Sequence, residues 1–366
     1  MAGLEATLAL RSLAGDRVKL TLLAASPEFV YRPMTVREPF GFTRAARYSV
    51  PDIAAALDVD LVQDSLVRVD PAAQTVATEA GLSLSYDALL LGIGARVTAR
   101  YKHAITIDDR QLDEQLHGLI QDVDEGYVRR LAFIAPSPMP WPLPMYELAL
   151  MIARRAFDMN VQLSITIATP EPGPLAVFGT NVSERVEQLL EDHDILTIPS
   201  AHVDVPEKGV VTINPGGRSL HVDRIVALPQ LTGPIIPGIP ASPPDGFIAI
   251  DELCRVRGLE RVWAAGDATD FTIKMGGIAA QQADIAAADI ARPTGAEAER
   301  RPFTPELRAV LLGGEKPLYL SALFAGGAGT RSEVSDSPTW SPPTKIAARY
   351  LAPYLEMRDS LTGTAR

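Results

Sequence analysis

Apolar residues recur along the chain in two periods, one typical of helices and one of strands, and their order predicts the first elements. Small and apolar residues at helical spacing run over 3–13, and the Ala-Gly-Asp at 14–16 ends that helix. The short apolar run 18–23 is typical of a buried parallel strand. Residues 26–39 hold three prolines and are expected to form a loop, and several short β-type runs follow over 61–91.

A second series of helices and strands follows the first. In chain order the pattern predicts a helix near 108–122, a strand over 131–134, a helix over 145–156, a strand over 161–168 and a helix over 181–192. The two series close on similar segments, since 86–90 and 222–226 each carry an acidic residue and an apolar run. This repeated alternation predicts an α/β fold with two doubly wound, dinucleotide-binding-like (Rossmann-type) domains.

The composition changes after Arg292, where a stretch rich in Gly, Pro and Ser begins and leads to a basic, aromatic and apolar end. We predict that residues 1–100 and 230–295 form the first domain. The second domain is expected over 101–229, and a small C-terminal α+β domain over 296–366.

Composition and charge exclude several classes of function. The net charge of -11 argues against general nucleic-acid binding, which needs a basic surface. The single cysteine, Cys254, allows neither an intramolecular disulfide nor a dithiol redox centre, and the five histidines have no metal-ligand spacing. No run of about 20 apolar residues predicts a transmembrane helix, and the start lacks the features of a signal peptide. We therefore expect a cytoplasmic protein without a metal site.

The clearest candidate site begins where a hydrophobic strand runs into Ala265-Gly266-Asp267. Glycine lets a ligand approach the backbone closely, and a carboxylate just past a strand end can accept hydrogen bonds from sugar-like hydroxyls. Gly276-Gly277 then opens an alanine-rich helix, whose first N–H groups favour an electron-rich oxygen. A plain turn before a packed helix is the alternative for the Gly-Asp pair alone.

This block resembles the second flavin motif of the FAD-dependent pyridine-nucleotide oxidoreductases. The most similar branch contains type II NADH dehydrogenases, sulfide:quinone oxidoreductases and flavocytochrome c sulfide dehydrogenases. The resemblance implies that Asp267 binds the ribityl chain of FAD and that the helix start at Gly277-Ile278 faces the flavin pyrimidine. Lys274 and Gly276 match a Lys-x-Gly element of the sulfide-oxidising branch.

The beginning of the chain resembles only the end of the family's first glycine motif. In the family, a strand leads through G-x-G-x-x-G into a helix, and here Ala2–Ala6 matches the start of that helix, with Gly3 as the third glycine. The strand and the first two glycines are absent. Either the start is misassigned and the natural protein is longer, which we favour, or the truncation is real and FAD binding is weak or lost.

Two further segments resemble parts of the family that line FAD. The loop holding Arg32 and Pro33 is similar to one beside the flavin, although an aromatic-rich loop over a core is an equal alternative. The segment holding Gly92 and Gly94 is similar to an Ala-Thr-Gly element that approaches the dinucleotide. The acidic residue that usually binds the adenosine ribose is missing, and Glu28 could replace it only if the loop folds back.

The second domain does not carry a site for NAD(P)H. Between its first strand and helix stands the segment 135–144, which holds five prolines and no glycine. Proline has no N–H to donate to a phosphate, so the usual pyrophosphate cradle cannot form. The next strand is followed by Thr169 instead of an acid, and Glu171 is a poor ribose ligand.

The same segment also argues against sulfide oxidation by the usual cysteine route. In similar flavocytochrome c sulfide dehydrogenases this loop carries a catalytic cysteine, and Trp141 stands at about that place here. Cys254 lies in an unrelated segment and is expected to be a buried core thiol. Glu147 either faces the flavin or caps its helix.

Two functional hypotheses follow. The first is an FAD-dependent oxidoreductase that passes electrons from an unidentified small-molecule donor to a quinone or another carrier, with Lys274 and Glu147 as weak catalytic candidates. The second is a degenerate flavoprotein fold that binds FAD weakly or not at all and serves as a binding or partner protein. The segment 340–355 interleaves aromatic and basic residues, which suit a membrane surface, a core or a homodimer interface. Peripheral membrane contact is the less favoured of these.

Overall fold

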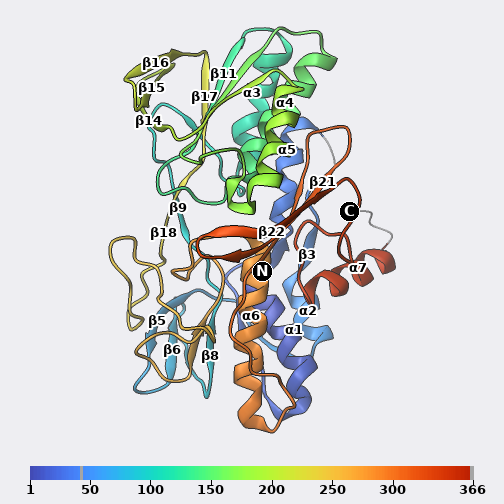
Figure 1. Cartoon of the computed structure of the whole chain (residues 1–366). Helices are drawn as coiled ribbons and strands as arrows, with labels where there is room; N and C mark the ends of the chain where they lie inside the picture. The colour runs from blue at the N-terminus through green and yellow to red at the C-terminus, as the bar shows by residue number, and fades with distance from the viewer. Residues whose placement is uncertain (42–43, 363–366) are drawn as a thin grey trace.

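The computed structural model describes residues 1–41 and 44–362. It forms two α/β units, with a C-terminal β-hairpin crossing between them (Figure 1). The first unit contains α1 (Ala2–Ala14), β1 (Thr21–Leu23), β2 (Glu28–Val30), the 3-10 helix η2 (Arg32–Phe40), β3 (Arg47–Ser49), α2 (Val50–Ala56), β4 (Asp60–Val62), β5 (Leu66–Asp70), β6 (Thr75–Thr78), β7 (Ser83–Ser85) and β8 (Leu89–Leu91), and later β19 (Val262–Ala264) and α6 (Gly276–Ala291).

The second unit is entered through β9 (Arg96–Thr98) and left through β18 (Gln230–Thr232), which pair antiparallel. Between them lie β10 (Ile105–Thr106), α3 (Leu112–Asp124), β11 (Arg130–Ile134), α4 (Leu143–Asp158), β12 (Ser164–Ala168), α5 (Thr180–Glu191), β13 (Ile195–Ile198), β14 (His202–Glu207), β15 (Val210–Asn214), β16 (Arg218–His221) and β17 (Arg224–Ala227). The C-terminal part consists of β20 (Glu306–Leu311), β21 (Leu318–Ala325), β22 (Ala328–Ser335) and α7 (Leu351–Thr362). The predicted α/β class with two Rossmann-type units is confirmed.

The parallel strands of the first unit form two separate pairs. β1 lies beside β4, and β8 lies beside β19, each in parallel register. In the described part of the chain, the two pairs share no backbone hydrogen bonds. The helices α1 and α6 run alongside each other next to these strands (Figure 1). Their contact is made of small residues, including Ala2, Ala6 and Ala283, so the two backbones approach closely.

Three local predictions need correction. Of the run 18–23, only Thr21–Leu23 is a strand, and it is not buried, because one edge of β1 has no strand partner among the described residues. The segment 26–39 is no loop, since β2 pairs with β3 and η2 follows. Proline suits the start of such a helix, where its missing N–H costs nothing. The run 86–91 forms a strand only over Leu89–Leu91.

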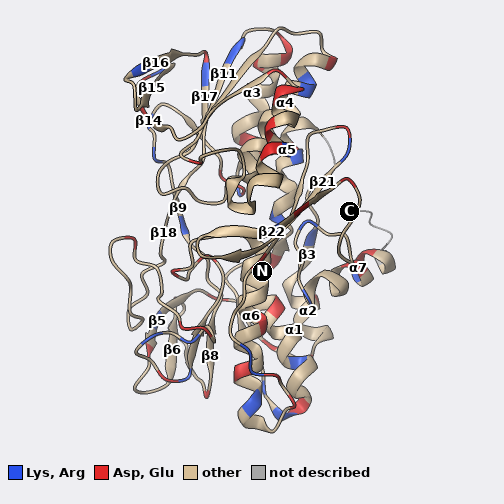
Figure 2. Cartoon of the chain, in the orientation of Figure 1, with Lys and Arg blue, Asp and Glu red and all other residues tan. Residues whose placement is uncertain are grey.

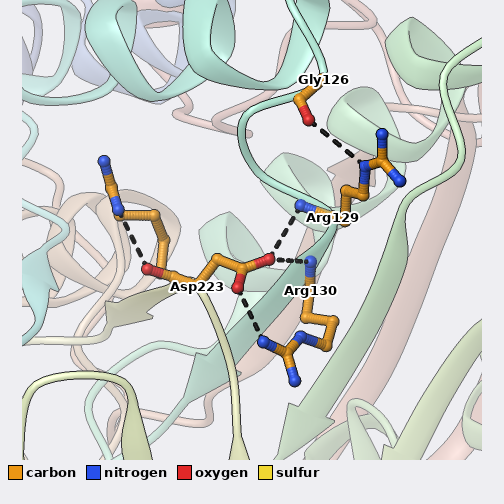
Figure 3. Close-up of polar contacts among 5 residues, drawn as sticks. Gly126, Arg129, Arg130 and Asp223 are labelled. Carbon is orange, nitrogen blue, oxygen red and sulfur yellow. Dashed lines mark hydrogen bonds and ion pairs between the residues drawn. The ribbon is translucent and has the colours of Figure 1, made fainter.

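The second unit has a continuous five-stranded parallel sheet in the order β10-β17-β11-β12-β13. Its central strand β11 is buried on both faces. Leu131 and Phe133, at 0% exposure, pack with residues of α3, α4 and α5, whereas Ala132 and Ile134 pack with residues of β14 and β15. The acidic residue of the closing segment has a structural role here. The backbone N–H groups of Arg129 and Arg130 donate to Asp223 Oδ2 at 3.0 and 2.9 Å, and the Arg130 guanidinium donates to Oδ1 (Figure 3).

The C-terminal sheet β20–β22 packs into the core of the second unit. Leu307 and Leu320 belong to the same buried cluster as Phe133 and Leu148. The segment after the sheet packs on the first unit instead, where Ile346 and Leu351 contact the cluster that contains Leu4 and Leu8. The C-terminal part thus holds the two units together, and the domain boundaries given above remain a prediction. None of the helices described here has both the length and the apolar character needed to cross a membrane.

Candidate functional site

The ends of β8 and β19 meet the start of α1, and glycines allow the contact. A Cβ at Gly92, directly after β8, would lie 2.9 Å from the backbone nitrogen of Gly3. Gly266, after β19, has a φ of 81°, and a Cβ there would lie 3.0 Å from the Cβ of Ala279 in α6. Carboxyl ends of parallel strands next to helix N-termini are the usual place for nucleotide ligands in doubly wound folds. At Gly3 there is room for a side chain, since the nearest atom to an added Cβ would be Leu22 Cδ1 at 4.0 Å.

Asp267 lies at the centre of this arrangement. It follows Gly266 directly, and no described residue donates a hydrogen bond to its carboxylate. Its burial raises the pKa, while the nearby cations of Lys274 and Arg32 act in the opposite direction. Asp267 is half-buried and its oxygens are not among the buried atoms without a partner, so a ligand can reach the carboxylate and donate to it. The site therefore suits a ligand with hydroxyl groups.

Lys274 supports the turn that carries Asp267. Its ammonium group donates to the carbonyl oxygen of Thr269 and lies 3.7 Å from the centre of the Phe247 ring. The hydroxyl of Thr269 in turn donates to the Gly266 carbonyl at 2.9 Å. Burial lowers the pKa of Lys274 to about 8, although the neighbouring Asp267 favours its charged form. The buried ammonium group of Lys274 thus stabilises the turn by its hydrogen bond to Thr269.

The start of η2, at Arg32 and Pro33, lies beside the same group of charges. The Arg32 guanidinium is 3.6 Å from Asp109, an ion pair that was not predicted. The amino group of Met1 is buried near Arg32 and Asp267, and this burial lowers its pKa to about 6. The structure therefore brings Arg32, Asp267 and the start of α1 together.

The start of α6 offers two backbone donors. Within the described residues, the N–H groups of Gly277 and Ile278 have no acceptor, as is usual for the first turn of a helix. Gly276 has a different reason to be glycine, because a Cβ there would lie 2.5 Å from Ile346 Cδ1 in the C-terminal segment. Gly94 has a φ of 73°, but a Cβ there would contact nothing within 4 Å. Glu28 is exposed on β2.

A buried ion pair next to this site was missed from the sequence. Lys345 Nζ donates to Glu147 Oε2 at 2.7 Å and to the Pro33 carbonyl at 2.8 Å, and Leu312 N donates to Glu147 Oε1 at 3.0 Å. Glu147 and Lys345 are 0% and 9% exposed. Of the two alternatives for Glu147, helix capping is not what the structure shows, because its oxygens are bound by these other segments. The pair joins the second unit, the C-terminal segment and the start of η2.

The second unit is packed where a dinucleotide site would be expected. Trp141, in the proline-rich segment, contacts the ring of the buried Phe178 at a centroid distance of 5.7 Å. Glu171 is also buried, and it accepts hydrogen bonds from the hydroxyls of Tyr146 at 2.6 Å and Thr169 at 3.1 Å. Burial raises its pKa to about 7. Glu171 therefore has a structural role, as the acceptor for two buried hydroxyl groups of the second unit.

Thiol and metal chemistry find no support in the described residues. Cys254 is 0% exposed, and burial raises the pKa of its thiol well above the usual value. The prediction of a buried core thiol is confirmed. Among residues 1–41 and 44–362, no group of three or more His, Cys, Asp or Glu side chains could hold a metal ion.

Comparison with known proteins identifies the fold. No family model matches the chain. It is 22% identical over 255 residues to a sulfide-quinone reductase of Aquifex aeolicus (strain VF5), an alignment that covers 63% of this chain and only 57% of that protein. The crystal structure of the sulfide:quinone oxidoreductase from Aquifex aeolicus superposes with a TM-score of 0.82, at 17% identity, over 99% of this chain and 89% of that one. The fold is that of a sulfide:quinone oxidoreductase.

A second solved structure supports this assignment of the fold. The ferredoxin reductase for the CYP199A2 system from Rhodopseudomonas palustris matches with a TM-score of 0.67 at 16% identity, over 89% of this chain and 81% of that one. The resemblance to this group of proteins is thereby confirmed at the level of the fold. The roles of the individual site residues remain predictions.

Proposed function

We propose that the protein is an FAD-dependent oxidoreductase that passes electrons from a small-molecule donor to a quinone or another carrier. The observation that carries the proposal is the half-buried Asp267 carboxylate, which lies just after β19 without a hydrogen-bond donor among the described residues. Similarity to a sulfide-quinone reductase, in sequence and in fold, supports the choice of chemistry. Fold alone would not, because one fold hosts many functions.

The residues present fit FAD, and each has an assignable part in holding it. Asp267 would accept hydrogen bonds from the ribityl hydroxyls, and the N–H groups of Gly277 and Ile278 would donate to the flavin pyrimidine. Arg32, Pro33 and the start of α1 at Gly3 would line the dinucleotide, with the Arg32 cation near its phosphates. When bound, FAD would supply the acceptance and release of electrons.

The donor is proposed to be neither NAD(P)H nor sulfide by a cysteine route. The segment between β11 and α4 has no glycine and five prolines, so it lacks the N–H groups that cradle a pyrophosphate. The only thiol, Cys254, is buried and held in its unreactive protonated form. Anaerobic mixing of the FAD-loaded protein with a panel of reductants tests this. Rapid loss of the flavin absorbance on mixing with NADH or NADPH, within the time of one catalytic turnover, would contradict the proposal that NAD(P)H is not the donor.

FAD binding is tested by absorbance of the purified protein and by titration with FAD. The proposal expects flavin bands, and it expects Asp267→Ala to weaken FAD binding about 10- to 100-fold, because a hydrogen-bonded charged group contributes about 1.5–3 kcal/mol. Asp87→Ala is the matched control, because Asp87 is exposed and makes no hydrogen bond in the described chain. A colourless protein that takes up no FAD would refute the enzyme hypothesis for this chain.

One observation favours the alternative of a flavoprotein fold that no longer holds FAD. The β1–β4 and β8–β19 pairs are not joined by hydrogen bonds, so the sheet next to the proposed FAD site is interrupted in the described chain. A binding or partner protein would need the scaffold without the cofactor. The same FAD titration separates the two candidates.

A further inference from the structure

A cavity of about 490 Å³ lies away from the candidate FAD site. Its walls come from the middle of α6, the segment leading into β20, and the C-terminal segment before and into α7. Asp284, on its α6 wall, is eight residues beyond Gly276, which corresponds to about 12 Å along the helix. Gly266, Asp267, Lys274 and Arg32 do not line it. The volume is within the range of small-molecule sites, about 300–1,000 Å³.

The cavity is rich in positive charge, in a protein whose net charge is -11. Three arginines line it: Arg301, Arg308 and Arg349. Arg308 is used internally, since its guanidinium donates to both oxygens of Glu306 at 2.9 and 2.8 Å. Among the described residues, Arg301 and Arg349 have no carboxylate within ion-pair distance.

Besides Glu306, one other acidic residue lines the cavity, Asp284, and it does not neutralise Arg301 and Arg349 at neutral pH. Asp284 faces Glu5 of α1, and Glu5 is fixed because the N–H groups of Tyr350 and Leu351 donate to its oxygens at 2.9 and 2.6 Å. Burial, and then the neighbouring Glu5, raise the pKa of Asp284 to about 8. Its Oδ1 atom is buried and has no hydrogen-bond partner. The charge that a ligand in the cavity would meet therefore comes mainly from the two arginines.

The remaining walls combine polar residues, Gln281, Thr304 and Ser341, with apolar and aromatic ones. Phe303 and Trp340 contribute rings, and Pro302, Pro342 and Pro353 contribute rigid apolar surface. An inorganic anion would leave this surface exposed to water, whereas a ligand with a carbon body would cover it. A guanidinium group presents a planar fork of donors that matches a carboxylate.

We propose that this cavity is a second binding site, which takes a small organic carboxylate. The guanidinium groups of Arg301 and Arg349 hold the carboxylate, and the rings of Phe303 and Trp340 cover the carbon body of the ligand. The site does not depend on FAD, because no residue assigned to the flavin lines it.

Calorimetric titration of the full chain with benzoate at neutral pH tests the proposal, with inorganic phosphate at the same ionic strength as the comparison. We expect saturable binding of benzoate, and binding at least about tenfold weaker in the double variant Arg301→Gln/Arg349→Gln, because a charge-assisted hydrogen bond is worth at least about 1.4 kcal/mol. Arg218→Gln is the control, since Arg218 is exposed on β16 and does not line the cavity. Both arginines of the double variant are exposed, so the variant is expected to fold, which circular dichroism checks.

A pH series adds an independent readout. Above about pH 8 Asp284 becomes an anion beside Glu5, Arg301, Arg349 and Tyr350, and it then competes with the ligand for the arginines. Benzoate binding is expected to weaken between pH 7 and pH 9, and to weaken less in Asp284→Asn. Absence of saturable benzoate binding at millimolar concentration would overturn the proposal. Equal binding of benzoate and phosphate, or unchanged benzoate binding by the double variant, would overturn it as well.

Discussion

Glu147 and Lys345 are 198 residues apart in the chain, yet their side chains form a buried ion pair at 2.7 Å. Removing one member leaves a charge in the interior without a partner, which typically costs about 3–5 kcal/mol. We therefore expect Lys345→Met to lower the free energy of unfolding by about that amount, measured by urea denaturation. The double variant Glu147→Gln/Lys345→Met should recover a large part of the loss, because no unpaired charge remains.

The exposed pair of Lys19 and Asp60, at 2.9 Å, provides the control. Lys19→Met should leave the urea midpoint almost unchanged, since both side chains lie in water. Equal losses of unfolding free energy in Lys345→Met and Lys19→Met would show that the buried ion pair contributes no more to stability than the exposed one.

Glu171 predicts a fall of stability as the pH rises. Burial raises its folded-state pKa to about 7 from an ordinary value of 4.5, so the folded protein keeps a proton that the unfolded chain has lost. Stability from this group is therefore complete below about pH 4.5 and is lost as the pH rises to about 7. Between pH 5 and pH 8 the wild type should lose about 2 kcal/mol more than Glu171→Gln.

Urea unfolding at both pH values measures this difference, and Glu187→Gln, at an exposed position on α5, is the control. Asp284 titrates in the same direction, but it does so in all three proteins and cancels from the comparison. An identical pH dependence of the wild type and Glu171→Gln would rule Glu171 out as the source.

At the residue scale, the sequence predicted what a local motif encodes. Asp267 was found because the strand, the glycine and the acid are consecutive, and Cys254 because a single thiol in an apolar setting is usually buried. Lys345 was missed as the partner of Glu147, and Asp109 as the partner of Arg32. Such pairs depend on how distant segments pack, and no spacing in the sequence reports them.

At the scale of elements, the start of α6 packs closely against the C-terminal segment because Gly276 has no side chain. A Cβ at Gly276 would lie 2.5 Å from Ile346 Cδ1 and 3.1 Å from Cγ1. Ile346 is 5% exposed and packed, so it cannot move away freely. Gly276→Ala is expected to lower the free energy of unfolding by about 1–3 kcal/mol through overpacking.

Gly118→Ala is the matched control, because Gly118 lies inside α3 with nothing within 4 Å of a Cβ. There the substitution should stabilise the protein by up to about 1 kcal/mol, the difference in helix propensity. The double variant Gly276→Ala/Ile346→Ala should lose less unfolding free energy than the sum of the two single losses. The smaller side chain at position 346 makes room for the methyl group added at position 276. If the two losses of unfolding free energy add exactly, a side chain at position 276 does not clash with Ile346.

Elements with a clear helical or strand period were predictable, and irregular ones were not. The helices α1, α4 and α5 differ from the predicted ranges by at most two residues at either end, because their apolar faces repeat regularly. The proline-rich segment 26–39 was predicted wrongly as a loop. Its strand β2 is stabilised by pairing with β3, a contact that lies outside the segment itself.

At the scale of the whole molecule, the sequence predicted two doubly wound units but not how unequal their sheets are. Figure 2 shows acidic and basic residues spread over both units, so charge does not distinguish them. Strand pairing does, because five strands form one sheet in the second unit and the parallel strands of the first form two pairs. The C-terminal part could not be placed from sequence, since its sheet packs on one unit and its last helix on the other.

The unequal sheets predict unequal resistance to local opening. β11 is paired on both sides, by β12 and β17, and its core residues are fully buried, whereas β1 and β8 each have a single partner and are partly exposed. Backbone amides open with free energies that follow pairing and burial. Hydrogen–deuterium exchange followed by mass spectrometry should therefore show slow exchange in peptides covering Arg130–Ile134 and fast exchange in those covering Thr21–Leu23 and Leu89–Leu91. Equal protection of all three peptides would mean that the strand pairs of the first unit are held as firmly as the continuous sheet, and that the interruption between them has no consequence for stability.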